Sequence, residues 1–111
     1  MTIETLVTKL ETAGFDVYLN EADDGVSCPY IVLINITNPN FAADNKVYTK
    51  TTSLDLRLIE SEVHDWKLIQ TLEDTLDKIP LTYNSTDLRD PSEHVCEMNY
   101  ELTFLGGITN G

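Results

Sequence analysis

Basic side chains are scarce in this chain, whose 111 residues hold 7 Lys and Arg against 19 Asp and Glu. The difference, 7 − 19, is a net charge of −12. Proteins that bind nucleic acid through its phosphates, or that bind an anionic membrane, need clustered Lys and Arg. We therefore expect neither kind of binding. High solubility, or the lining of a passage through which DNA slides without capture, suits such a charge better.

Long apolar runs are missing too. No segment approaches the roughly 20 residues of a transmembrane helix, and residues 1–15 lack the basic start and apolar stretch of a signal peptide. We therefore expect folding in a reducing cytoplasm. The hydrophobic content of 41% is nevertheless too high for a disordered chain. The length fits one domain, which we place at residues 1–105, with a flexible C-terminal tail over 106–111.

Cysteine and histidine occur only twice each, which limits the chemistry that the chain can carry. Cys28 and Cys96 lack metal-type spacing, and both are expected in buried strands, where a thiol behaves as a small hydrophobe. A disulfide is the less favoured alternative without export. His94 and Cys96 are a conceivable base and nucleophile, but alternation places Cys96 on an apolar strand face, which favours an inert thiol. His64 and its neighbour Asp65 do not face each other if both are helical.

Catalytic and ligand-binding motifs are absent as well. The chain has no GxGxxG or GxxxxGK[ST] phosphate loop, no GxSxG elbow and no HExxH. The acidic turn at residues 23–25 invites Ca²⁺, but an EF-hand loop that starts at Asn20 has Ala22 at its third position and Ile31 at its twelfth. An ordinary Asp-Gly turn is the better interpretation. The sequence thus predicts no enzyme, no metal and no cofactor.

Two amphipathic segments predict helices. The first is capped by Thr2 and ends near Gly14. The second begins after Ser61 as N-cap, with acidic residues in its first turn, and carries a stripe of apolar residues until Pro80 stops it. Trp66 opens that stripe, so we expect it to pack in the core rather than to stack on a ligand.

Alternating segments predict the strands. The segment 29–36 is apolar on both faces, which favours a central position with a helix covering one face and another subunit the other. The remaining expected strands are a short one over 15–19, a long one from Val47 to Ile59, a short piece over 81–83 and a half-buried one over 96–104, with loops over 37–46 and 84–94.

This order predicts an α+β domain, in outline α-β-β-β-α-β with the short piece at 81–83 before the last strand. We expect a mostly antiparallel sheet with both helices packed on one face. The two-sided apolar strand and the long strand after it suit a chain that completes its core against copies of itself, as in a closed ring.

The same elements resemble a known family. An amphipathic helix and an acidic Gly turn lead into "PYIVLINI", "DNKVYTKTTSLDLRLI", "DWKLIQTLEDTLDKI" and "CEMNYELTF". This combination, spanning residues 3–104, is similar to the tail-terminator or tail-completion proteins at the neck of long-tailed bacteriophages. It is a pattern of elements without a strict motif, so no functional residues are carried over. The resemblance implies a compact α/β fold and a hexameric ring in the virion, assembled in the host cytoplasm. Such a ring caps the tail tube protein and meets the head connector protein.

The resemblance suggests a role for the charge, since DNA passes through the neck. Acidic residues of the turn and of the 84–94 loop are candidates for an acidic ring lumen, although an ordinary solvated surface is as good an interpretation for any one of them: Glu21, Asp23, Asp24, Asp87, Asp90 and Glu93. Phe41 in the long loop, with Val47 and Tyr48, is a candidate subunit interface, against the alternative of a local cap on the monomer core.

Three other functions stay open. A head-closure or adaptor protein would share size and composition but bind on the portal side. A small cytoplasmic ligand-binding α+β domain should form a pocket with convergent polar groups, of which the sequence holds no trace. An acidic mimic of DNA would need acids spaced along one exposed face, whereas these are scattered among loops and helix surfaces.

Overall fold

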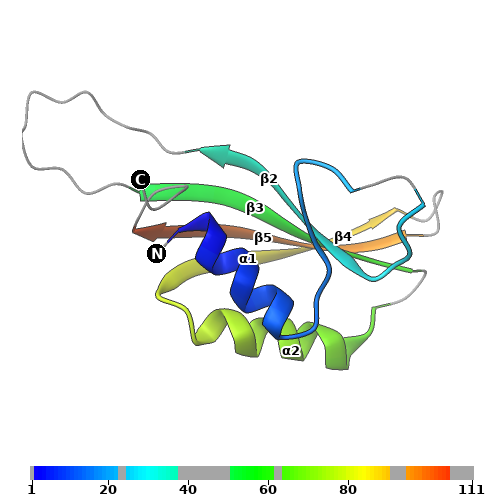
Figure 1. The fold of residues 1–111 in the computed structure, drawn as a ribbon. Helices are drawn as coiled ribbons and strands as arrows, with labels where there is room; N and C mark the ends of the chain where they lie inside the picture. Colours follow the sequence, from blue (N-terminus) through cyan, green and yellow to red (C-terminus); the bar gives the residue numbers. More distant parts are fainter. Residues whose placement is uncertain (1, 23–24, 38–50, 62–63, 91–94, 106–111) are drawn as a thin grey trace, which may run out of the picture.

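The computed structural model describes residues 2–22, 25–37, 51–61, 64–90 and 95–105. Its elements are α1 (Ile3–Thr12), β1 (Val17–Leu19), β2 (Tyr30–Thr37), β3 (Thr51–Glu60), α2 (Trp66–Asp77), β4 (Leu81–Asp90) and β5 (Val95–Leu105) (Figure 1). The strands form one sheet in the order β1-β2-β3-β5-β4. Only β1 and β2 pair in parallel, and the other neighbouring strands are antiparallel. The expected α+β class with a mostly antiparallel sheet is confirmed.

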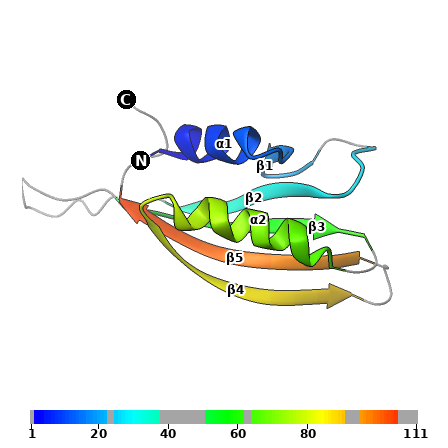
Figure 2. The ribbon, with the colours of Figure 1, turned by 90° about the horizontal axis from the view of Figure 1, so that it is seen from below.

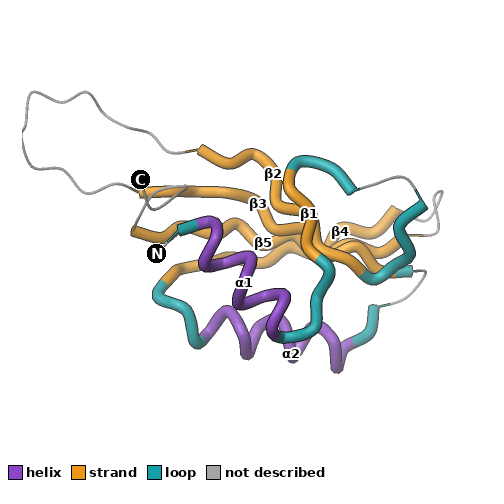
Figure 3. Tube along the Cα trace, in the orientation of Figure 1, coloured by secondary structure: helices purple, strands orange, loops and turns teal. Residues whose placement is uncertain are grey.

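Both helices lie on the same face of this sheet (Figure 2). On β3, every second side chain is buried against them, from Thr52 through the three leucines to Glu60. The core between helices and sheet is mainly aliphatic and includes three aromatic side chains, those of Phe15, Tyr100 and Phe104. Its fully buried members include Leu6, Leu10, Ile31, Leu33, Leu56, Leu58, Leu72, Leu76, Tyr100 and Leu102. The helices therefore cover one face of the sheet, and the described chain places no element on the other (Figure 3).

The helix boundaries follow capping chemistry. The Thr2 hydroxyl accepts a hydrogen bond from the Thr5 N–H at 3.1 Å, and Gly14 follows α1 with a φ of +103°, as expected of a residue just beyond a helix end. The prediction that Ser61 is the N-cap of the second helix is wrong. The Asp65 carboxylate caps α2 instead, because it accepts from the N–H groups of Lys67 and Leu68, so the helix begins four residues later.

The prediction of a loop over residues 84–94 is wrong for residues 84–90, which belong to a strand. Residues 81–90 form the edge strand β4, which pairs with β5 along its whole length from Leu81 opposite Phe104 to Asp90 opposite Val95. An edge strand bonds to one neighbour only and meets water along its other side, so it does not need an apolar sequence. β4 is formed by main-chain hydrogen bonds to β5, and the pattern of apolar and polar residues does not predict such bonds.

Two side chains expected in the core lie outside it. Trp66 is 65% exposed and rests against the His64 ring, with the ring centroids 5.1 Å apart, because it is the first residue of α2 and the core stripe starts one turn later. Cys28 is exposed because β2 begins two residues after it. Cys96 is buried as expected, and no disulfide joins these two described cysteines.

Candidate functional site

The uncovered face of the sheet divides into an apolar and a polar half. We call the apolar half the apolar strip, defined as Tyr18, Tyr30, Val32, Ile34 and Ile59, which all point away from the helices. Tyr18 and Tyr30 meet edge to face, with ring centroids 6.0 Å apart, and every member of the strip is only half-buried. Antiparallel sheets commonly present a polar face to water, so an apolar group here marks a candidate contact surface.

In the polar half, side chains of neighbouring strands hydrogen-bond to one another. The Asn35 amide donates to Asp55 at 2.8 Å, and the hydroxyls of Ser53 and Thr103 lie 3.1 Å apart. Arg57 donates to the Asn99 side chain at 3.4 Å. These pairs run along the middle of the same face, so they border the apolar strip on its β3 side.

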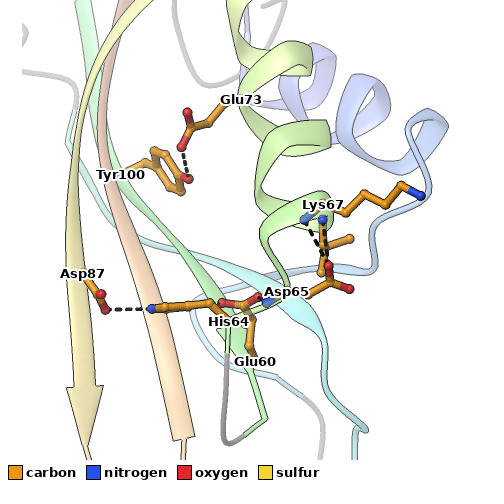
Figure 4. Close-up of polar contacts among 8 residues, drawn as sticks. Glu60, His64, Asp65, Lys67, Glu73, Asp87 and Tyr100 are labelled. Atoms are coloured by element: carbon orange, nitrogen blue, oxygen red, sulfur yellow. Dashed lines mark hydrogen bonds and ion pairs between the residues drawn. The ribbon is translucent and has the colours of Figure 1, made fainter.

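A second cluster lies on the helix face, at the corner where β3 leads into α2 (Figure 4). The His64 ring is almost fully buried and places one nitrogen on each of two carboxylates. Nδ1 bonds to Oε2 of Glu60, the last residue of β3, and Nε2 bonds to Oδ1 of Asp87 on β4 at 2.8 Å. The other oxygen of Glu60 accepts the Asp65 N–H at 2.8 Å. His64 therefore connects β3, the start of α2 and the edge strand.

Opposing effects act on the charge of His64. Burial lowers its pKa, but hydrogen bonds to Glu60 and Asp87 and the negative charges of both carboxylates outweigh burial, so the pKa of His64 lies above its ordinary value. An ionised carboxylate only accepts hydrogen bonds, so a ring that bonds to two of them must carry a proton on each nitrogen. Because both nitrogens are engaged, neither is available to take a proton from a substrate.

A small pocket of about 120 Å³ lies beside this cluster and is lined by Cys28, Pro29, Glu60, Ser61, Asp65 and Leu68. Its carboxylates already have structural partners, since Glu60 holds His64 and Asp65 caps α2. Two larger hollows, each about 400 Å³, lie between the helices and at the end of the sheet. Both are open to solvent and lined mainly by Thr, Lys and aliphatic side chains.

No protein-family model matches the chain, and no curated protein matches it. Within the described ranges, no three His, Cys, Asp or Glu side chains are arranged to hold a metal ion. Neither α1 nor α2, nor any other helix in the described part of the chain, has the length and apolarity to cross a membrane.

The residues singled out from the sequence fall in several places. Glu21 follows β1 at one edge of the sheet, whereas Asp87 lies on β4 at the opposite edge, so the fold does not bring them together within one chain. Asp90 ends β4, but its side chain is outside the described part of the chain. The other candidates for the lumen and the subunit interface also lie outside the described residues: Asp23, Asp24, Glu93, Phe41, Val47 and Tyr48.

The residue pattern does not predict the His64 cluster, because it places His64 in a helix and Asp87 in a loop. Leu81 and Tyr83 give a partial signal, because a strand that continues beyond them with period two places Asp87 on the same face as Tyr83, the helix face. A second signal was Glu60, which extends the buried alternation of β3 as a charged residue. A buried charge requires a partner, and His64 is the nearest histidine in the sequence.

Proposed function

We propose that this protein is a structural component of a bacteriophage neck, in which copies assemble into a ring that caps the tail tube and joins the tail to the head connector. The observation that carries the proposal is the apolar strip, because it leaves half of one sheet face available for a second copy. The resemblance of the element order to tail-terminator proteins supports a position at the neck, and the net charge of −12 suits a passage for DNA.

A single repeated contact is enough to build such a ring. A surface that binds a different surface on the next copy generates a closed ring when the rotation between copies closes. Burying half-exposed tyrosine, valine and isoleucine side chains provides the apolar driving force for that contact, at roughly 25 cal/mol per Å² of apolar area. Tyr18 and Tyr30 are the strongest candidates within the strip, since tyrosine is enriched among residues that dominate binding energy.

The first experiment measures the mass of the purified protein by light scattering behind a sizing column, alone and with tail tube protein. We expect a discrete ring mass at high concentration or on the tube. The strip variant Val32→Asp should abolish the ring and still fold, because Arg57 lies directly opposite Val32 and can pair with the new carboxylate. The matched control, Thr103→Asp, puts the same charge on the polar half of the same face and should assemble normally.

Three outcomes would contradict the proposal. A monomer that binds no tail tube protein at any concentration argues against a tail terminator. Binding only to the portal-side connector would favour the head-closure or adaptor alternative. Equal loss of assembly in Val32→Asp and Thr103→Asp would remove the apolar strip from the interface.

A further inference from the structure

We propose that Glu60, His64 and Asp87 form a proton-dependent latch, in which charged His64 fastens the edge strand β4 to the corner between β3 and α2, and loss of its proton frees that part of β4. The inference is independent of the proposed function. It rests on the geometry of the cluster and concerns the conformation of a single chain.

The latch spans the width of three strands. In the sheet order, β5 lies between β3 and β4, with Glu60 opposite Cys96 and Asp87 opposite Met98. The His64 ring thus crosses over β5 on the helix face and reaches from one neighbour to the other (Figure 4). Elsewhere β4 is held by its main-chain ladder to β5 and by a hydrogen bond from the Tyr83 hydroxyl to Asp77 on α2.

The two halves of the latch differ in their exposure to water. The side chains of His64 and Glu60 are 1% and 3% exposed, whereas that of Asp87 is 49% exposed. Water can therefore replace His64 at Asp87 at little cost, but not at Glu60, whose second oxygen also holds the Asp65 N–H. When the proton leaves, we expect the Asp87 contact to break first and the Glu60 contact to persist.

Charged and titratable groups from each packed element bear on this ring. β3 supplies Glu60, β4 supplies Asp87, and β5 supplies Cys96 opposite Glu60 and, further along, the Tyr100 hydroxyl, which donates to Glu73 of α2. The start of α2 adds the Asp65 carboxylate, which is committed to the helix cap, and the Trp66 ring. The two charges in direct contact with His64 are both negative and favour its protonated form.

The sign of the pH dependence follows from linkage. The pKa of His64 is raised in the folded chain, so the latch is fully formed below the ordinary histidine pKa of about 6.5. Above that pH the opening equilibrium of β4 should rise by up to tenfold per pH unit, and it should level off beyond the folded-state pKa. Other carboxylate contacts of β4, such as Asp77 with Tyr83, involve no histidine and should not contribute in this range.

The experiment follows amide hydrogen exchange of β4 and the ring signals of His64 by NMR from pH 6 to 9, with exchange rates corrected for the intrinsic effect of pH. In the wild type, opening of β4 should rise above about pH 6.5 and level off at the pH where the ring signals report that His64 has lost its proton. In Asp87→Asn the basal opening should be larger and its pH dependence much reduced. The matched control, Asp77→Asn, removes the other carboxylate contact to β4 and should keep the wild-type pH dependence.

Asp87→Asn is the main variant because its exposed position makes misfolding less of a concern than in His64→Gln. The proposal is overturned if the His64 ring is neutral at pH 6, or if β4 opening has the same pH dependence in the wild type and in Asp87→Asn. Loss of the pH dependence in Asp77→Asn as well would assign the effect to general loosening of β4.

Discussion

At the scale of single residues, Tyr100 is the largest side chain among those that the core buries completely. Its hydroxyl donates to Oε2 of Glu73 at 2.9 Å, and its ring meets Tyr83 edge-on with centroids 5.7 Å apart. Burial, with the Glu73 contact adding to it, raises the pKa of Tyr100 far above its usual range. The hydroxyl therefore stays protonated and serves as a donor that anchors α2 to β5.

Replacing Tyr100 by Phe tests this anchor. We expect Tyr100→Phe to lower the free energy of unfolding by about 1–2 kcal/mol, since it removes a hydrogen bond to a charged acceptor that is only partly exposed. Tyr83→Phe is the matched control. It removes an exposed hydroxyl contact with Asp77 and should cost about 0.5 kcal/mol or less. Urea unfolding at neutral pH measures both, and equal losses would contradict a special role for the buried hydroxyl.

Single residues were predictable from the sequence where local chemistry decides their role. Thr2 and Gly14 behave as expected because capping depends on the few residues around a helix end. The surroundings of Trp66 and His64 are not predictable in this way, because they depend on where α2 starts and on Asp87, which lies 23 residues after His64. Contacts between distant segments are set by packing, which a periodic pattern alone does not specify.

At the scale of elements, β2 contains a bulge that changes the meaning of its sequence. Ile34 pairs with Asp55 but Thr37 pairs with Ser53, so β2 carries one extra residue there, and Asn35 adopts a φ of +53°. The bulge reverses the alternation, so Ile36 packs against the core instead of extending the apolar strip. The pattern of residues 29–36 therefore predicts one isoleucine too many on the uncovered face, because Ile36 faces the core.

Variants of Asn35 test the bulge. Asn tolerates the left-handed region better than most residues, whereas Ala is strained there. We expect Asn35→Ala to lower the free energy of unfolding by about 1–2 kcal/mol, from strain plus the lost contact with Asp55. Asn35→Gly loses the same contact without the strain and should cost less. Thermal unfolding that ranks Ala as stable as Gly would contradict the strain argument.

The strands were predicted in proportion to how much of their surface is buried. β2, β3 and β5 bury one face along most of their length, so the alternation of apolar residues predicts them as strands. Among the side chains of β4 that the structure describes, the apolar ones that pack against the core are Leu81 and Tyr83, and the sequence shows alternation only there. The rest of that strand depends on hydrogen bonds to β5, which any residue except proline can make.

At the scale of the whole molecule, composition and element order were enough to predict an α+β sheet with both helices on one side. They could not predict which strands form the edges, because β5 inserts between β3 and β4. That insertion brings Asp87 within reach of His64 and leaves the apolar strip beside the β1 edge. The candidate sites therefore follow from the strand order, whereas the fold class follows from the residue pattern.

The net charge of the chain should make its assembly depend on salt. Copies that each carry −12 repel one another, so an interface made by the apolar strip must overcome this repulsion. Salt shortens the screening length from about 30 Å at 0.01 M to about 3 Å at 1 M and leaves apolar contact intact. We therefore expect sedimentation velocity to show more assembly as NaCl rises. Dissociation by salt would instead indicate an interface made of ion pairs, and the described lysines between the helices, Lys9 and Lys78, would then replace the strip as the surface to mutate.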